Sequence, residues 1–150
     1  MKVEKLLSYY ANLGEGLEVG SGPFGNRLIV EVDGGEFEGP GIKGTIRKAG
    51  CADWLAMDEE YGHLDVRATF VTDDDAVIYV QYNGHIELTP GIQAALGGEG
   101  ETNMGDQYFF TTIRMQTGHE KYRYLNNLVC IGQGRLNNGR VEYDVYKAMN

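Results

Sequence analysis

Short segments in which apolar and polar residues alternate recur along this chain of 150 residues, and turn signals separate them. In one such segment, the apolar residues at the even positions from Leu64 to Phe70 alternate with Asp65, Arg67 and Thr69. Successive side chains of a strand point to opposite faces, so this pattern predicts a β-strand with one apolar and one polar face. An acidic turn and a second alternating segment follow, which is typical of a β-hairpin.

The same reasoning predicts strands over most of the chain, at residues 28–32, 36–38, 42–48, 51–57, 64–71, 76–83, 108–116, 124–131 and 140–147. Residues 3–13 fit either a short helix or a strand, and 88–96 a short helix. Residues 97–107 have little to bury and predict a mobile loop. Twenty-two glycines and only three prolines suit many tight turns. We expect one all-β antiparallel domain over residues 1–150, and polar inner faces favour a barrel around a cavity.

Charge and composition exclude several classes of partner. The net charge of −9 and pI near 4.7 argue against nucleic acid, since binding to phosphates depends on clustered Lys and Arg. No apolar run approaches the roughly 20 residues that span a bilayer, and no signal peptide is apparent at residues 1–13. Cys51 and Cys130 are expected to be reduced, buried thiols. We therefore expect a cytoplasmic protein without a membrane partner.

An ordered series of short motifs spans almost the whole chain: Gly39-Pro40-Gly41, Ala52-Asp53-Trp54, Leu64-Asp65-Val66-Arg67, Thr72-Asp73-Asp74, Ile78-Tyr79-Val80, Tyr108-Phe109, Thr111-Thr112, Arg114, Thr117-Gly118, Tyr122, Leu125-Asn126 and Tyr143-Asp144-Val145-Tyr146. Together these motifs resemble the DUF3237 family of UPF0311-type proteins, whose function is unknown. The resemblance implies an antiparallel, calycin-like β-barrel with an internal cavity, in which residues 3–13 form the first strand.

The chain departs from the family pattern at four positions on or near two predicted strands. The family often carries Arg, Pro and Glu where this chain has Phe110, Ile113 and Gln116, and Trp where it has Tyr124. If Phe110 and Gln116 face inward, these differences remove one charge of each sign. A more apolar ligand, aromatic or terpenoid-like, is therefore expected.

Asp65 and Arg67 are the first candidates for catalysis, because they stand two apart on one strand. Inside a barrel, the guanidinium would hold an oxyanion while the carboxylate moved a proton. A structural ion pair or an outward salt bridge explains the same residues. Asp53 is a second candidate acid, with Trp54 as an aromatic wall beside it. A turn-capping Asp and a packed Trp are equally compatible with that motif.

A larger set of polar and aromatic residues is predicted to bind substrate, because several of them share strand faces. Any one of them is explained by packing, and only their convergence in one cavity would make a binding site. The predicted substrate-binding residues are Trp54, Tyr79, Gln81, Tyr108, Phe110, Thr112, Arg114, Tyr124 and Asn126.

Neither a metal nor a cofactor is expected. His63, His85 and His119 are placed in or near loops, with no carboxylate or cysteine at ligand spacing. The glycines at 97–100 lack the strand-to-helix context of a phosphate loop. No serine or cysteine nucleophile with a partner base is visible.

Two hypotheses for function follow. The first is a cofactor-independent enzyme that holds a small apolar or aromatic natural-product or catabolic intermediate in the barrel, and catalyses isomerisation, cyclisation or lyase chemistry by proton transfer. The second is a non-catalytic carrier or sensor that uses the same cavity. Both predict a small-molecule ligand, and a homo-oligomer formed through the outer faces is compatible with either.

Overall fold

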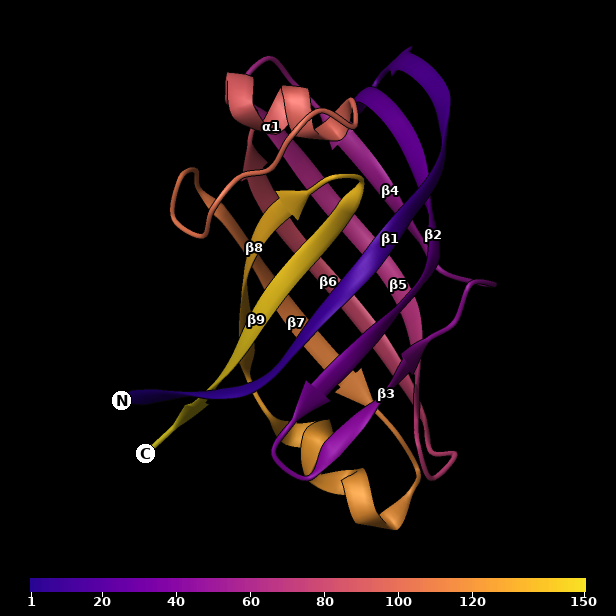
Figure 1. Cartoon of the computed structure of the whole chain (residues 1–150), viewed down its shortest axis with the longest axis vertical. Helices are drawn as coiled ribbons and strands as arrows, with labels where there is room; N and C mark the ends of the chain where they lie inside the picture. The colour runs from indigo at the N-terminus through magenta and orange to yellow at the C-terminus, as the bar shows by residue number, and fades with distance from the viewer.

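The computed structural model describes all residues 1–150 as a closed ring of antiparallel strands (Figure 1). The strands are β1 (Lys2–Gly22), β2 (Gly25–Gly39), β3 (Ile42–Ile46), β4 (Ala52–Met57), β5 (Tyr61–Thr72), β6 (Val77–Glu87), β7 (Phe109–Gln116), β8 (Cys130–Asn137) and β9 (Arg140–Met149). Two short helices are added, α1 (Pro90–Leu96) and the 3-10 helix η1 (Glu120–Asn127).

The ring closes because β1 pairs with β9 on one side and β2 on the other. Two short strands share one position between β2 and β5: β4 pairs with the first half of β2, and β3 with its second half. Nine strands therefore occupy eight positions. The two termini lie side by side because Lys2 of β1 is in register with Met149 of β9 (Figure 1). A closed ring has no exposed sheet edge.

The barrel wall follows the alternation of the sequence. On β5 the residues with even numbers from Leu64 to Phe70 are buried, and on β6 so are Ile78, Val80 and Tyr82. Inward rows from the other strands complete one continuous core. On β8 the inward positions include Gly134, where a Cβ atom would lie 2.8 Å from the Tyr143 ring. The glycine therefore makes room for an aromatic ring inside the barrel.

Each end of the barrel carries one of the helices, α1 at the upper end in Figure 1 and η1 at the lower end. Thr89 caps α1 by accepting a hydrogen bond from the Ile92 N–H, and Ile92 is fully buried. At the other end Asp74, in the β5–β6 turn, accepts hydrogen bonds from the hydroxyls of Thr72 at 2.6 Å and Tyr122 at 2.7 Å. This carboxylate fastens η1 to the turn. Neither helix is long and apolar enough to cross a membrane.

The structure tests three predictions made from the sequence. Residues 3–13 are part of a strand, as the resemblance implied. The strand predicted at 124–131 is wrong, because Glu120–Asn127 forms a 3-10 helix and β8 begins only at Cys130. Residues 97–107 have no helix or strand, but Thr102 exchanges hydrogen bonds with the backbone of Leu136 on β8. These bonds tie the predicted loop to the barrel wall.

Candidate active site

Most of the predicted site residues lie on the outside of the barrel. The apolar row of β5 fills the interior, so Arg67 is exposed and Asp65 is half-buried on the opposite face. Arg67 lies 5.8 Å from the Trp54 ring, an outer-surface cation–π contact. The expectation that Asp65 and Arg67 form a charged pair inside the barrel is therefore wrong. The polar row faces solvent because the apolar row has the larger gain from burial.

The same correction applies to the predicted substrate-binding set. Tyr79 and Tyr108 are exposed at 43% and 52%, and Gln81 accepts a 2.7 Å hydrogen bond from Arg114 across the outer face. Phe110 and Thr112 belong to the same outer face of β6 and β7. These residues do lie near one another, as the sequence predicted. They lie on the outer face of the barrel, however, and not in its interior.

Tyr124 and Asn126 lie at the lower end of the barrel, on η1. Asn126 exchanges two hydrogen bonds with the backbone of Thr117, at 2.8 and 2.9 Å, and Tyr124 is exposed. The side chain of Asn126 thus satisfies the backbone N–H and C=O groups of Thr117, just beyond the end of β7. Neither residue lines the interior.

Asp53 is the one predicted site residue that faces inward. It lies on β4 opposite Val66, whose side chain is buried in the core. Its Oδ1 atom accepts a 2.9 Å hydrogen bond from the backbone N–H of Asp65. The carboxyl group lines a pocket of about 60 Å³, which we call the upper pocket, and the other 15 lining residues are all hydrophobic.

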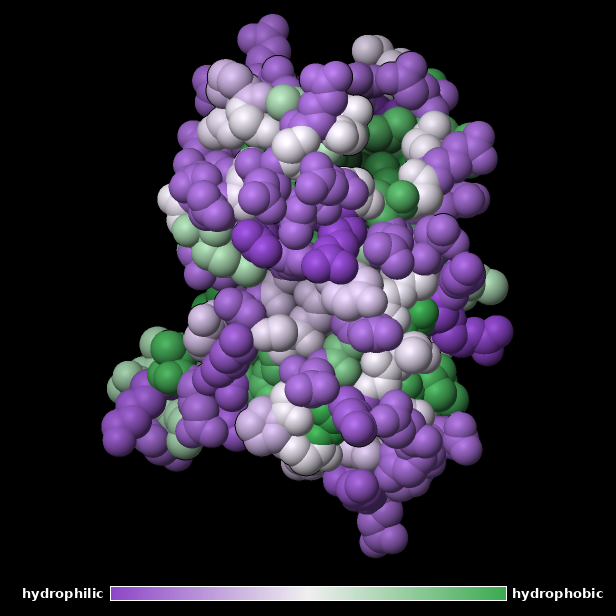
Figure 2. Space-filling model, in the orientation of Figure 1, coloured by the Kyte–Doolittle hydropathy of each residue, from purple (hydrophilic) through white to green (hydrophobic).

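The upper pocket lies at the end of the barrel near α1. Leu13 of β1, Val30 of β2 and Leu96 of α1 are among the residues that line it. In Figure 2, hydrophobic side chains gather in a recess at the upper right, between the β1–β2 hairpin and the α1 end. The pocket that holds the Asp53 carboxyl group is thus surrounded by apolar side chains.

Burial changes the acidity of Asp53. Desolvation raises the pKa of its carboxyl group from 3.8 to about 6, while the hydrogen bond from the Asp65 backbone and the charge of Arg27 partly oppose that rise. A carboxyl group with this pKa exists in both protonation states close to neutral pH. It is therefore suited to accept and return a proton.

Three buried tyrosines form a cluster beside Asp53. The Tyr143 ring lies 4.9 Å from that of Tyr9 and 5.5 Å from that of Tyr82, and Tyr82 and Tyr143 also line the upper pocket. The hydroxyls of Tyr9 and Tyr143 are buried without a hydrogen-bond partner. Burial raises the pKa of all three phenols well above 10.0, so they remain protonated, and the unpartnered hydroxyls are free to donate a hydrogen bond to a ligand.

The sequence carried a signal for this cluster. Tyr82 shares the row of Ile78 and Val80, which the alternation already identified as apolar, and Tyr143 alternates with polar residues in the same way. A tyrosine in an apolar row has its hydroxyl buried in the core. A buried hydroxyl requires a hydrogen-bond partner, either in the protein or in a ligand. That requirement distinguishes Tyr82 and Tyr143 from Tyr79 and Tyr108, which stand in polar rows.

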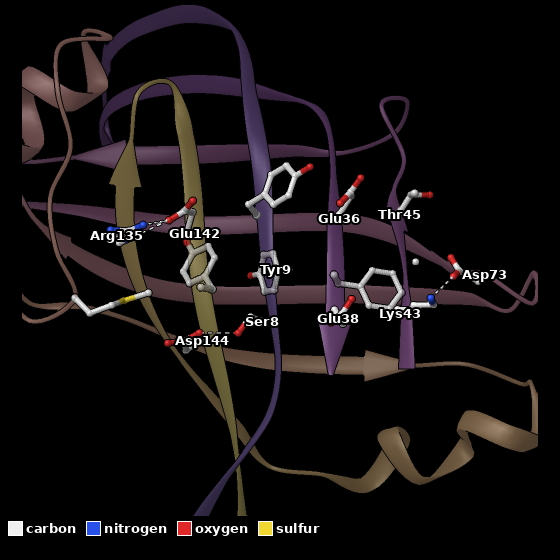
Figure 3. A pocket seen from close by; sticks show the side chains of 15 residues that line it. Ser8, Tyr9, Glu36, Glu38, Lys43, Thr45, Asp73, Arg135, Glu142 and Asp144 are labelled. Atoms are coloured by element: carbon white, nitrogen blue, oxygen red, sulfur yellow. Dashed lines mark hydrogen bonds and ion pairs between the residues drawn. The ribbon is translucent and has the colours of Figure 1, made fainter. Parts of the chain in front are cut away.

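A larger groove of about 680 Å³ crosses the outer face of β9, β1, β2 and β3 (Figure 3). Its charged residues largely satisfy one another. Arg135 contacts Glu142 at 2.6 Å, Asp144 accepts a 2.7 Å hydrogen bond from Ser8, and Lys43 lies 3.7 Å from Asp73. Paired surface charges stabilise the fold by small amounts and leave few groups for a ligand. The upper pocket, with its single carboxyl group and the unpartnered hydroxyl of Tyr143, is the better candidate site.

No group of three or more His, Cys, Asp or Glu side chains comes together in a form able to hold a metal ion. Two of the three histidines nevertheless differ from their expected positions. His63 and His85 lie within β5 and β6, and Asp58 contacts the His63 ring at 3.0 Å. The contact between Asp58 and His63 was not expected from their spacing in the sequence. It forms because the turn before β5 brings Asp58 back beside the start of that strand.

Comparison with known proteins gives the family. The model of a protein family described as "Protein of unknown function (DUF3237)" matches residues 1–148. The chain belongs to the DUF3237 family. A UPF0311 protein of Rhodopseudomonas palustris is 30% identical over 151 residues, which cover 99% of this chain and 97% of that protein.

Solved structures agree with the barrel. A conserved protein of unknown function from Rhodopseudomonas palustris has a TM-score of 0.90 at 28% identity, covering 99% of this chain and 97% of that one. A β-barrel-like protein from Acinetobacter baumannii has a TM-score of 0.81 at 28% identity, covering 97% and 94%. An enzyme from Penicillium herquei shares the fold, with a TM-score of 0.67 at 19% identity and coverage of 97% and 93%.

Proposed function

We propose that this member of the DUF3237 family is a cofactor-independent enzyme that binds a small apolar or aromatic compound inside a calycin-like barrel. Asp53 is the proton-transferring group of this proposal. The observation that carries it is the position of one carboxyl group, with its pKa raised to about 6, in a pocket otherwise lined by hydrophobic residues. Strong desolvation of a single acid in a pocket is typical of functional sites.

The chemistry we propose is proton transfer within one substrate molecule. The Asp53 carboxylate takes a proton from a hydroxyl or an activated C–H group and later gives the same proton to another substrate atom. The phenols of Tyr82 and Tyr143 donate hydrogen bonds to the oxygen on which negative charge develops. Because the proton returns to the substrate, isomerisation, cyclisation and elimination all balance without a cofactor.

The lining of the upper pocket supports a neutral, mostly apolar substrate with one or two oxygen functions. No cationic side chain lines the pocket, so a free carboxylate or phosphate would find no counter-charge there. The volume of about 60 Å³ is below the roughly 300–1,000 Å³ of most ligand sites, so binding requires lining residues such as Leu96 of α1 to move outward. Leu96 is 41% exposed and stands at the end of a helix of seven residues.

One similar protein is described as an enzyme, the Penicillium herquei protein. Its likeness to this chain concerns the fold, and it agrees with catalysis as one use of such a barrel. The alternative is a carrier or sensor that holds the same class of ligand without changing it. The nearly uniform apolar lining favours this alternative, because an apolar lining is sufficient for binding.

The experiment that tests the proposal begins with native mass spectrometry of protein purified from its own host, followed by extraction and identification of any retained small molecule. The identified compound and its chemical precursors are then incubated with the wild type, Asp53→Asn and Asp65→Asn. An enzyme that uses Asp53 loses turnover in Asp53→Asn but keeps it in Asp65→Asn, whose side chain lies on the outer face. Binding without turnover in all three proteins would support the carrier. Equal turnover in all three would reject Asp53 as the catalytic group.

A further inference from the structure

Two imidazole rings meet on the outer face of the barrel. His63 of β5 lies directly opposite His85 of β6 in the strand register. Their Nδ1 atoms are 3.0 Å apart, and the ring planes cross at 84°. Both side chains are exposed, so this pair is open to solvent.

A carboxylate fixes the orientation of one ring. The Nε2 atom of His63 lies 3.0 Å from Oδ2 of Asp58, and Oδ1 of Asp58 accepts backbone hydrogen bonds from Glu60 and Tyr61 at 2.8 and 2.7 Å. An ionised carboxylate only accepts hydrogen bonds, so Nε2 of His63 is the donor. The Nδ1 atom of His63 therefore carries a lone pair, and Nδ1–H of His85 donates to it.

The distance between the two Nδ1 atoms also fits a shared metal ion. Metal–imidazole bonds are about 2.0–2.1 Å long, so two of them at a right angle place their nitrogens about 3.0 Å apart, whereas a tetrahedral angle requires about 3.4 Å. The observed 3.0 Å matches the right angle of square-planar and octahedral ions. Asp58 supplies the carboxylate partner that metal-bound histidines commonly have on their second nitrogen.

We propose that His63 and His85 form a binding site for a divalent transition-metal ion on the outer face, with Cu²⁺ preferred over Ni²⁺ and Zn²⁺. The metal takes the place of the shared proton, which moves through solvent to Nε2 of His85. Both rings then turn from the hydrogen-bonded orientation so that their Nδ1 lone pairs meet at the ion beside the line that joins the two nitrogens. No third His, Cys, Asp or Glu completes the set, so water fills the remaining positions.

The surroundings of the pair are consistent with a solvated cation. The two histidines line one side of an outer groove of about 600 Å³, together with Tyr108 and Phe110, so the open coordination positions have room for water. The net charge of −9 favours cations over anions near the surface. The site is independent of Asp53, because neighbouring Leu64 points into the barrel while the histidines point out.

Titration of the metal-free protein with Cu²⁺, followed by electron paramagnetic resonance, tests the site. We expect one Cu²⁺ per chain with two coordinated imidazole nitrogens, and weaker binding of Ni²⁺ and Zn²⁺ in competition. His63→Ala and His85→Ala should each weaken Cu²⁺ binding at least tenfold. His119→Asn is the matched control, because it removes the third imidazole while retaining a side chain able to cap η1, as His119 does for the Lys121 N–H.

Asp58 is a positioning residue in this proposal. Asp58→Asn keeps an oxygen for the backbone N–H groups of Glu60 and Tyr61, so the metal-free protein should still fold. Its unfolding temperature should be slightly below that of the wild type, because those hydrogen bonds lower the pKa of the Asp58 carboxyl and the neutral amide lacks its charge. Its Cu²⁺ affinity should fall about tenfold, as is typical when a ligand's hydrogen-bond partner is lost. The proposal is overturned if His85→Ala binds Cu²⁺ as the wild type does, if only one imidazole is coordinated, or if His119→Asn causes the same loss as His85→Ala.

Discussion

Replacing Asp53 by Asn should make the protein more stable at neutral pH. The substitution keeps an oxygen that accepts the hydrogen bond from the Asp65 backbone, but it removes a charge from an apolar pocket. The pKa of Asp53 is raised from 3.8 to about 6 in the folded chain. Each pKa unit corresponds to 1.36 kcal/mol, so the carboxylate lowers the free energy of unfolding by about 3 kcal/mol at pH 7 as an upper bound.

The direction of the pH dependence follows from proton binding. Between pH 3.8 and about 6 the folded chain holds a proton on Asp53 more often than the unfolded chain does. Raising the pH through this window therefore lowers the contribution of Asp53 to stability, and above the window the cost is constant. Asp53→Asn lacks this loss. Its advantage over the wild type should be absent near pH 3.5 and complete near pH 7.

Urea unfolding of the wild type, Asp53→Asn and Asp65→Asn at a series of pH values measures this difference. Because each comparison is made at one pH, titrations common to both proteins cancel. Asp65→Asn should keep most of the pH dependence of the wild type, since it leaves Asp53 buried and removes only the smaller contribution that the Asp65 charge makes to the raised pKa of Asp53. If the free energies of unfolding of the wild type and Asp53→Asn differ by the same amount at pH 4 and pH 7, folding does not raise the pKa of Asp53 and its carboxyl group is not desolvated.

Three further predictions concern the barrel wall and its lower end. Gly134→Ala should lower the free energy of unfolding by about 1–3 kcal/mol, because the added Cβ would lie 2.8 Å from Tyr143 and 2.9 Å from Phe109; urea unfolding at wild-type stability would show that the rings have room to move. Tyr143→Phe removes a buried hydroxyl without a partner, so its stability should be equal or higher, and a loss above about 1 kcal/mol would mean that the hydroxyl is hydrogen-bonded. Asp74→Asn should speed hydrogen exchange in η1 at pH 7. The hydroxyls of Thr72 and Tyr122 hold the pKa of Asp74 below its ordinary value, so the ionised carboxylate stabilises the fold. This stabilisation is present above about pH 4 and weakens as the pH falls. Unchanged exchange in η1 would show that this carboxylate does not fasten the helix.

The sequence identified most strands because alternation is a local property. Residues 64–71 and 76–83 are recognisable without knowledge of the fold, and the structure pairs them as β5 and β6. Alternation also separates each strand into two rows, but it does not state which row faces inward. The prediction placed the polar row of Asp65 and Arg67 inside the barrel, whereas the structure places that row outside and the apolar row inside. The greater free-energy gain from burying Leu64 and Val66 was sufficient to decide between the rows.

The positions of Asp53 and η1 depend on contacts between distant segments. Asp53 faces inward because β4 is in register with β5, and no local pattern in residues 52–57 determines that register. Residues 120–127 contain β-favouring tyrosines, yet they form a 3-10 helix whose Tyr122 hydroxyl reaches Asp74, 48 positions earlier. A contact of that separation in sequence outweighed local propensity.

The proposed function requires a small aromatic compound with an oxygen function to bind inside the barrel next to Asp53. Protein labelled at its methyl groups and at its aspartate carboxyl carbons, titrated with phenol and observed by nuclear magnetic resonance, tests this binding. We predict saturable shifts of the inward methyl groups of Leu64 and Val66, together with the carboxyl carbon of Asp53, and no comparable shift of the exposed Ile131. Shifts confined to Ile131 and its neighbours on the outer face, with the inward methyl groups unchanged at saturation, would show that the compound does not bind inside the barrel.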